Sequence, residues 1–394
     1  MDALSALVNL SASEKAQRGI AYTPQEIAQQ PQSWETTFTQ LRQRESEIRK
    51  FLRSSGIGDP ASTKPTVFLV GAGTSDFIGH SLHHLLRQHW RCEVVPVAST
   101  TLLTAFEESL LPDREYLWVS FSRSGESPEG VQVIERALDQ CPNVRHLVVF
   151  CNADGQMLRA IQGRSNSFAI VLDDVVNDRG LAMTSSFTNM VLTGQFLAHA
   201  WSVDKYEPIC RAMVRVASAL LPVAADMAKK LARGGYERAC FVGSAALTGA
   251  AMESALKLLE LTAGRVQTMW QSTLALRHGP MAALNEETLF VSMISSDPRR
   301  QKYELDLLRE VAGKQLARTV TAITPGPIDE VQHVADHVLA LDQTADVPDL
   351  YRPVLDVIFG QLLGLFTSLE VGLKPDTPSP KGVISRVVQN IGTY

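Results

Sequence analysis

The chain has 394 residues, a formal net charge of −5 and 45% hydrophobic residues, which suits a soluble protein of two or three domains and excludes extensive disorder. The acidic balance, without a lysine- or arginine-rich run, argues against a nucleic-acid or membrane-surface partner. Asp2 and the lack of a basic region before the first short apolar stretch argue against a secretory signal. Five cysteines without a CxxC pair predict a reduced, cytoplasmic protein.

The first half of the chain alternates between apolar strands and helices. Residues 1–54 are polar and helix-like, and Thr23-Pro24-Gln25-Glu26 has the form of a capping box. Strands are then predicted at 66–71, 93–98, 115–121, 145–151 and 167–172. Helices are predicted near 76–89, 100–109, 128–140 and 155–162. Near-continuous apolar strands between helices are typical of a parallel sheet covered on both faces.

The same alternation returns after a long helical stretch over 180–232. Strands are predicted at 238–243, 266–270, 288–295, 318–324 and 337–341, with helices near 247–263, 300–314 and 349–371. The apolar run 354–373 is interrupted by polar residues and indicates a buried helix rather than a membrane span. We therefore predict two similar α/β domains that arose by duplication. The predicted division is an N-terminal helical segment (1–54), a first domain (55–215), a second domain (216–373) and a C-terminal tail (374–394).

Two loops of the first domain carry hydroxyl groups directly after a strand. The segment 122–128 (SRSGESP) follows a buried strand and opens a helix, with Ser127 as the expected N-cap and Pro128 at the first helical position. The segment 71–76 (GAGTSD) lacks the sixth-position glycine of a dinucleotide loop and the lysine of a Walker A loop. Parallel strands present such loops at one edge of a sheet, so the two loops could share one phosphate. The alternative is a pair of ordinary capped turns.

The corresponding loops of the second domain read GSAAL (243–247) and SSDPRR (295–300). They have lost most of the hydroxyl groups. We therefore expect one phosphate site per chain, in the first domain.

The second domain holds the candidate acid–base residues. At 100° per residue, Glu253, Lys257 and Glu260 share one stripe of a helix that is apolar on most other sides. A carboxylate flanked by apolar residues suits a general base, whereas the alternative is a Glu253–Lys257 pair with an exposed Glu260. Gly279-Pro280 ends the next helical stretch and presents His278 in a loop, where a solvated histidine is the alternative.

Three histidines on the helix near 76–89 resemble a metal-binding face. His80, His83 and His84 have i, i+3, i+4 spacing. No cysteine or carboxylate accompanies them at the ligand spacing usual for zinc. We therefore expect no metal site.

These features together resemble the sugar isomerase (SIS) domain superfamily. The closer resemblance is to the tagatose-6-phosphate ketose/aldose isomerase family, also described as galactosamine-6-phosphate deaminase/isomerase. The similar segments cover nearly the whole chain: 23–34, 71–79, 120–129, 177–188, 253–266, 277–280, 303–308 and 375–389. The implied fold is two SIS domains, each with a doubly wound five-stranded parallel sheet flanked by helices.

The resemblance also implies roles for individual residues. Glu260 matches the glutamate that moves a proton between C1 and C2, and Lys257 matches the lysine one turn before it. His278 matches a ring-opening histidine that comes from the neighbouring subunit of a dimer. The expected phosphate- and substrate-binding residues are Gly73, Thr74, Ser75, Ser122, Arg123, Ser124, Ser127, Thr184, Ser185 and Arg386.

The implied activity is metal-independent aldose–ketose isomerisation or deamination of a hexose or hexosamine 6-phosphate, without a cofactor. Galactosamine 6-phosphate, giving tagatose 6-phosphate and ammonia, is the favoured substrate. The expected enzyme is a cytoplasmic homodimer with composite active sites and no nucleic-acid or membrane partner. Two alternatives stay open: a glucosamine-6-phosphate synthase-like isomerase without a glutaminase domain, and a non-catalytic phosphosugar-binding regulator.

The chain departs from the family pattern at three places. Met281 follows His-Gly-Pro where the deaminase branch often has lysine, and Glu126 stands where that branch tends to have asparagine. The synthase branch has a lysine near its C-terminus that touches the sugar carbonyl. Here that neighbourhood contains Arg386, and the nearest lysine is Lys381.

Overall fold

The computed structural model describes residues 1–59, 61–341 and 347–387. The chain forms two compact units that are discontinuous in sequence. Unit 1 comprises 1–31, 179–184 and 211–383, and unit 2 comprises 32–178, 185–210 and the residues from 384 onward. The predicted linear division into four parts therefore differs from the observed units, because residues 1–31 belong to unit 1 while the rest of the N-terminal segment, 32–54, belongs to unit 2. Residues 388–394 of the predicted tail lie outside the described residues.

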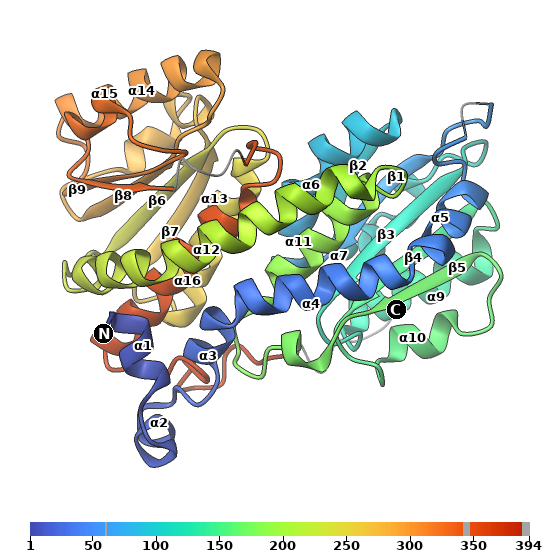
Figure 1. Ribbon diagram of the computed structural model, residues 1–394, viewed down its shortest axis with the longest axis horizontal. Helices are drawn as coiled ribbons and strands as arrows, with labels where there is room; N and C mark the ends of the chain where they lie inside the picture. Colours follow the sequence, from blue (N-terminus) through green and yellow to red (C-terminus); the bar gives the residue numbers. More distant parts are fainter. Residues whose placement is uncertain (60, 342–346, 388–394) are drawn as a thin grey trace. The chain divides into compact units, whose positions relative to one another are not determined.

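Unit 2 is built on the first sheet (Figure 1). Its strands are β1 (Thr66–Gly71), β2 (Val94–Ala98), β3 (Tyr116–Ser122), β4 (Val144–Phe150) and β5 (Ser167–Val171). They are parallel and ordered β2-β1-β3-β4-β5. The chain thus leaves β1 toward one edge and β3 toward the other, which makes the gap between β1 and β3 the topological switch point of this sheet.

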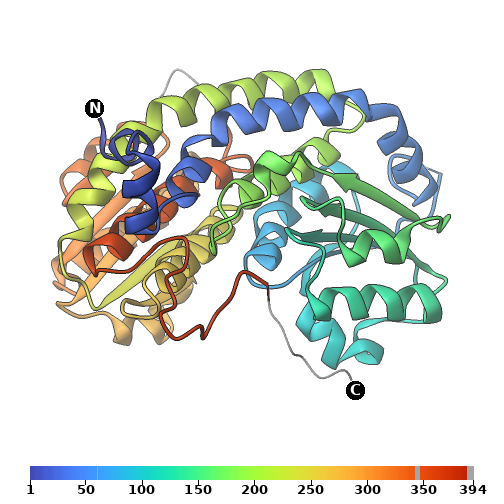
Figure 2. The same cartoon turned by 90° about the horizontal axis from the view of Figure 1, so that it is seen from below.

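Helices cover both faces of the first sheet (Figure 2). On one face α6 packs against α11, and on the other α7, α9 and α10 enclose apolar side chains of β1, β3 and β4. The described helices of this unit are α5 (Glu45–Ser54), α6 (Thr74–Trp90), α7 (Ser99–Thr104), α8 (Phe106–Ser109), α9 (Pro128–Gln140), α10 (Gln156–Ile161), the 3₁₀ turn η1 (Asp174–Val176) and α11 (Ser185–Ala198).

Unit 1 contains the second sheet. Its strands are β6 (Arg238–Gly243), β7 (Gln267–Ser272), β8 (Thr288–Met293), β9 (Thr319–Thr324) and β10 (His337–Ala340). They are parallel and ordered β10-β9-β8-β6-β7. Because β6 and β8 take the places of β1 and β3, both sheets have the same strand order and equivalent switch points.

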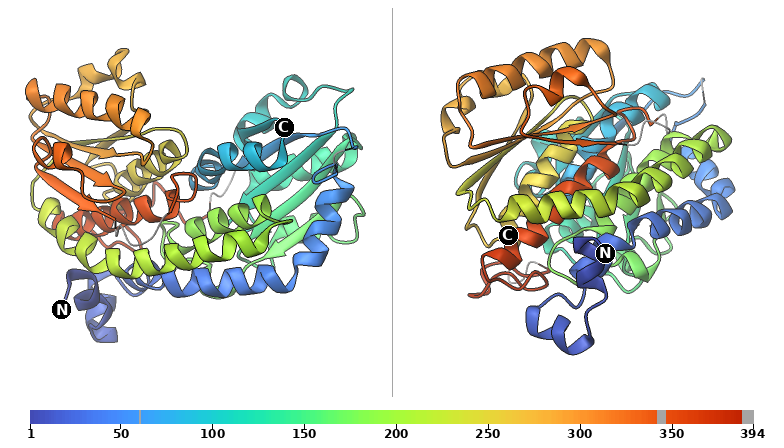
Figure 3. Two further views of the ribbon diagram at one scale, coloured as in Figure 1. Left: turned by 45° about the horizontal axis from the view of Figure 1, so that its top comes forward. Right: turned by 60° about the vertical axis from the view of Figure 1, so that its left-hand side comes forward.

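The second sheet also lies between two helical layers. α14 and α15 cover one face, while α13 and α16 lie on the other (Figure 3). The described helices of this unit are α1 (Ala3–Val8), α2 (Ala12–Arg18), α3 (Thr23–Ala28), α13 (Leu247–Leu261), η2 (Ala275–Arg277), η3 (Pro280–Ala283), α14 (Pro298–Gly313), α15 (Asp329–Gln332) and α16 (Pro353–Glu370). Two further helices contain residues of both units: α4 (Gln30–Gln43) and α12 (Val203–Ala232).

All ten predicted strands are confirmed to within two residues at either end. The predicted helical stretch 180–232 is two helices, because the chain turns tightly after α11. In that turn the N–H of Ser202 donates to the carbonyl of His199 at 2.8 Å, and the two side chains also meet, at 3.0 Å. The predicted helix near 100–109 is likewise divided, into α7 and α8.

The predicted capping box at Thr23–Glu26 is wrong. Thr23 is the first residue of α3 rather than its cap, and its hydroxyl donates to Asp376 at 2.7 Å. The carboxylate of Glu26 accepts the backbone N–H groups of Arg179 and Gly180. These polar groups therefore bind distant segments of unit 1 to one another instead of closing the end of their own helix.

Among the residues that the structure describes, two helices, α12 and α16, are long and apolar enough to cross a membrane on length and composition alone. The apolar window of α16 is 89% buried and that of α12 is 50% buried. α16 packs along α13 inside unit 1. The prediction of a buried helix in this region is therefore confirmed.

Candidate functional site

The loop after β1 brings the start of α6 unusually close to the first sheet. A Cβ atom at Gly71 would lie 2.3 Å from the backbone of Ser75, so only glycine permits this approach. Gly73 precedes the helix, and Thr74 and Ser75 are buried in its first turn. The N–H groups of Ser75 and Asp76 already donate to the carbonyls of Ala72 and Gly73, at 3.1 and 3.0 Å. The loop thus offers hydroxyl groups at a helix N-terminus, where the partial positive charge of the helix favours an anion.

The loop after β3 ends beside it, since β1 and β3 are neighbours. The hydroxyl oxygen of Ser122 accepts the N–H of Gly125 at 3.0 Å, and that of Ser124 accepts the N–H of Glu126 at 3.1 Å. Among the described residues neither hydroxyl hydrogen has an acceptor, so both can donate to an anion. Ser127 differs, because its hydroxyl donates to Glu129 at 2.8 Å. It occupies the predicted N-cap position of α9 without capping the helix through its side chain.

Asp76 lies in the first turn of α6, directly after these donors. Burial raises the pKa of its carboxyl group to about 6. Its Oδ2 lies 3.7 Å from Nε2 of His80, whose own pKa is lowered by burial and by His83. A partly neutral carboxyl group reduces the repulsion that a phosphate dianion would meet at this loop.

The two predicted binding arginines are connected in unit 2. The buried side chain of Arg123 donates to the backbone carbonyl of Arg386. The guanidinium of Arg386 donates to the carbonyl of Asp178 at 2.8 Å and to the amide oxygen of Asn177 at 2.7 Å. These bonds hold the segment around Arg386 against the residues that precede α11.

The remaining predicted binding residues, Thr184 and Ser185, are fully buried. The carbonyl of Thr184 accepts from the amide of Gln361 at 3.4 Å, within unit 1. The N–H of Ser185 donates to Asp178 at 3.1 Å, and Asp178 also accepts from the N–H and hydroxyl of Ser186. Asp178 thus satisfies the first turn of α11, a role for which the sequence pattern gave no signal.

The stripe predicted on α13 is a buried ion triad. Nζ of Lys257 lies 3.1 Å from Oε1 of Glu253 and also forms a short contact with Glu260. The side chains of Glu253 and Lys257 are 0% exposed, whereas that of Glu260 is 17% exposed. Burial lowers the pKa of Lys257, but the two carboxylates outweigh it and the net shift is upward. Lys257 is therefore a fixed cation, and Glu260 is the member of the triad that solvent or substrate can reach.

The packing of α13 on α16 explains how the triad stays buried. A Cβ atom at Gly360 would lie 2.4 Å from the side chain of Ser254, so the two helices can approach closely only with glycine at this position. This contact is the most extensive between any two elements of the described chain. It excludes water from the face that carries Glu253 and Lys257, which strengthens their electrostatic interaction.

His278 is exposed and follows the 3₁₀ turn η2. Gly279 beside it has a φ of 120°, a backbone conformation that favours glycine. Within the described ranges, no hydrogen bond or ion pair joins His278 to Glu260. The structure thus confirms the predicted loop and leaves the role of His278 a prediction.

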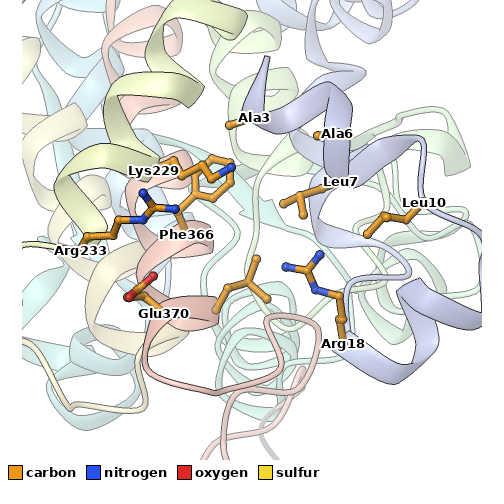
Figure 4. Close-up of a pocket in the computed structure, with 10 residues that line it drawn as sticks. Ala3, Ala6, Leu7, Leu10, Arg18, Lys229, Arg233, Phe366 and Glu370 are labelled. Atoms are coloured by element: carbon orange, nitrogen blue, oxygen red, sulfur yellow. The ribbon is translucent and has the colours of Figure 1, made fainter. Parts of the chain in front are cut away.

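Other features lie apart from the predicted residues. No group of three or more histidine, cysteine or carboxylate side chains suited to a metal ion is found in the part of the chain that the structure describes. A hollow of about 330 Å³ lies in unit 1. Figure 4 shows Arg18 of α2 on one side of it, and Lys229 of α12 and Arg233, directly after α12, on the other. Its lining contains no predicted site residue.

The chain is similar along most of its length to proteins of known family. No family model matches it. D-galactosamine-6-phosphate deaminase AgaS of Escherichia coli is 33% identical over 373 residues, which is 94% of each chain. The chain belongs to the D-galactosamine-6-phosphate deaminase AgaS family.

Two solved structures agree with this assignment. Tagatose-6-phosphate ketose/aldose isomerase from Escherichia coli is 32% identical, covers 92% of this chain and 95% of its own, and has a TM-score of 0.82. A Clostridium novyi structure described as a tagatose-6-phosphate ketose/aldose isomerase is 27% identical over 98% of both chains, with a TM-score of 0.92. The predicted fold class and family are confirmed.

Proposed function

We propose that this member of the AgaS family deaminates and isomerises D-galactosamine 6-phosphate to D-tagatose 6-phosphate and ammonia, without a metal ion or other cofactor. The observation that carries the proposal is the α13 triad, in which the partly exposed carboxylate of Glu260 stands beside the buried cation of Lys257. The curated relative named for D-galactosamine 6-phosphate and the solved tagatose-6-phosphate isomerase support the substrate. We also propose a cytoplasmic location and no nucleic-acid or membrane partner.

The phosphate group binds at the switch point of the first sheet in this proposal. Its donors are the hydroxyls of Ser122 and Ser124, the first turn of α6 with Thr74 and Ser75, and the backbone near Gly73. Hydroxyl and amide donors at a helix N-terminus suit a dianion because they supply both hydrogen bonds and partial positive charge. Arg123, Ser127, Thr184, Ser185 and Arg386 complete the proposed set as residues that shape these loops or approach the sugar.

Glu260 performs the proton transfer between carbon atoms. Its carboxylate removes the proton from C2 of the open-chain aldehyde, giving an enaminol when C2 carries an amine, and returns a proton to C1. The product is a ketosimine; water adds to its C2 and ammonia leaves, which yields the ketose 6-phosphate. Lys257 contacts this carboxylate directly and holds it in place for the proton transfer.

His278 opens the pyranose ring by moving a proton from the C1 hydroxyl to the ring oxygen. Its exposed position before Gly279-Pro280 suits a group that acts on a ligand rather than on its own fold. We propose that it acts on the substrate of a neighbouring copy of the chain in a homodimer with two composite sites.

A substrate panel tests this function. The purified protein is incubated with galactosamine 6-phosphate, glucosamine 6-phosphate and tagatose 6-phosphate, while ammonia and ketose are measured. We expect ammonia and ketose in equal amounts from galactosamine 6-phosphate. Faster release from glucosamine 6-phosphate would favour the synthase-like alternative, and binding without turnover of any sugar would favour the regulator.

The variant Glu260→Gln tests the proposed base. It keeps the shape of the side chain and removes its basicity, so kcat should fall by about 10²–10⁴ while sugar phosphate still binds. Glu330→Gln, an exposed carboxylate change on α15, is the matched control and should keep full activity. If Glu260→Gln retains more than about a tenth of the wild-type kcat, Glu260 is not the general base.

A further inference from the structure

The switch point of the second sheet holds an anion that belongs to the chain itself. Oδ1 of Asp349 accepts the N–H and the hydroxyl of Ser296, both at 2.9 Å, and Arg352 at 3.1 Å. Oδ2 accepts the hydroxyl of Ser295 and lies 3.4 Å from Arg300. Five donors, from the loop after β8, the first turn of α14 and the turn before α16, therefore surround a single carboxylate.

The surroundings of Asp349 are those of a built anion site. Asp349 is 7% exposed and Arg352 is fully buried. Arg352 is fixed by Asp356, at 2.6 and 3.1 Å, and by the carbonyl of Ile294 at 2.8 Å. Burial acts to raise the pKa of Asp349, but its bonds to Ser295 and Arg352 lower it overall, so the group stays ionised. A buried guanidinium held in place is a rigid and permanent cation for a carboxylate or phosphate.

The site has the same place in the fold as the proposed phosphate loops of the first sheet. β8 is equivalent to β3, and both strands lead through a serine-containing loop into a helix with proline in its first turn. The hydroxyl of Ser124 accepts the N–H two residues ahead, and the hydroxyl of Ser295 does the same with Asp297 at 3.0 Å. The difference is that the hydrogen of the Ser295 hydroxyl is already bound to Asp349.

We propose that the Ser295–Arg300 loop and Arg352 form a second oxyanion-binding site, and that Asp349 is its built-in occupant. The ligand class of this site is a carboxylate or another small oxyanion. This second site lies in unit 1 and uses none of the residues assigned to the proposed activity. It gives a physical reason for a single phosphate per chain: the second switch point is filled rather than merely poor in hydroxyl groups.

Two further carboxyl groups, those of Glu304 and Asp356, lie next to the site and contribute to its charge. Oε2 of Glu304 accepts the N–H of Ser295 at 2.7 Å, and burial raises the pKa of Glu304. Asp356 is engaged by Arg352, and burial raises its pKa to about 6. Asp349 itself contributes to raising both pKa values, but burial, the largest cause, remains when Asp349 is removed. The variant therefore loses the one carboxylate that contacts both Arg300 and Arg352. The emptied site should attract a small anion.

Chemical rescue tests the proposal. Asp349→Ala removes one carboxylate group, and formate has the size to replace it. The Tm of the variant should lie below that of the wild type and rise by about 2–4 °C as formate replaces chloride at constant ionic strength. The wild type, whose site is filled, is the baseline and should gain clearly less, which separates this effect from binding at the first sheet.

Asp349→Asn is the matched control, because its amide fills the same space but carries two N–H donors toward a cluster of donors. It should be destabilised and show no response to formate beyond that of the wild type. If Asp349→Ala does not fold in chloride, the yield of folded protein on refolding in formate against chloride replaces Tm as the readout. Equal behaviour of Asp349→Ala in formate and chloride, by either readout, overturns the proposal. A crystal structure of the variant grown in formate should show the ion on Ser296 and Arg352.

Discussion

At the scale of single residues, α13 buries the ionisable side chains of Glu253 and Lys257, although burying a charged group costs desolvation free energy that an apolar side chain would not. Lys257 is held by two carboxylates, and truncating one partner of such a group leaves an uncompensated buried charge that costs about 3–5 kcal/mol. This cost applies to the fully buried Glu253, whereas Glu260 reaches the surface. This difference in exposure, within one helix, distinguishes the structural Glu253 from Glu260, the proposed base.

Asp76 offers a test of buried charge through pH. Its folded-state pKa is raised from 3.8 to about 6, so the folded protein binds this proton more tightly than the unfolded chain. The associated stability is fully present below pH 3.8 and is lost as the pH rises through about 6. Asn cannot ionise, so Asp76→Asn should gain stability relative to the wild type between pH 4 and 7, by about 1–2 kcal/mol after allowance for partial exposure.

Urea unfolding measures this gain, and tryptophan fluorescence is a suitable probe because four of the five tryptophans, at 34, 90, 118 and 201, belong to unit 2. Asp113→Asn, an exposed change in the same unit, controls for the loss of one negative charge. A pH-independent difference between Asp76→Asn and the wild type would show that the Asp76 carboxyl group titrates alike in the folded and unfolded chains.

At the scale of elements, the hydrogen bonds in the loop after β3 predict that replacing Ser124 and replacing Ser127 will change KM by different amounts. Ser124 has a hydroxyl hydrogen without an acceptor among the described residues, whereas that of Ser127 is bound to Glu129. Ser124→Ala should raise KM about tenfold or more, the value of one hydrogen bond to a charged group, and change kcat little. Ser127→Ala should raise KM less. Steady-state kinetics decide, and a larger effect on KM at Ser127 would contradict the assigned anchor.

The elements themselves were largely predictable from the sequence. Parallel strands buried on both faces are continuous apolar runs, so Val67–Val70 and Phe290–Val291 were recognisable without knowledge of their partners. The position of the hydroxyl loops followed from the same alternation, whereas the doubly wound arrangement of the strands was implied by the family resemblance. Local sequence patterns did not predict the partners of polar side chains that form hydrogen bonds with distant segments of the chain. Thr23 bonds to Asp376, and Asp349 bonds to the loop at Ser295; no short-range rule relates residues so far apart.

At the scale of the whole molecule, the chain alternates between its compact units. Residues 179–184 belong to unit 1, although the segments on either side of them belong to unit 2. The carboxylate of Glu26 and the backbone of Arg179 and Gly180 hold this insertion within unit 1. Each unit consequently depends on segments that enter from the other part of the sequence, so cutting the chain at residue 215 or 216 would not yield two complete units.

The proposed homodimer makes a prediction about mixed subunits. If His278 serves the neighbouring chain, a dimer of one Glu260→Gln chain and one His278→Ala chain contains one site with both groups intact and one with neither. Two inactive variants should therefore regain roughly a quarter of the wild-type activity after random exchange, since half the dimers are mixed and each has one intact site.

The double variant mixed with His278→Ala is the control and should stay inactive, because none of its pairings restores both groups. Activity is measured after subunit exchange has been demonstrated with differently tagged chains. An inactive mixture at that point, or an active enzyme that sediments as a monomer, would show that His278 acts within its own chain or not at all.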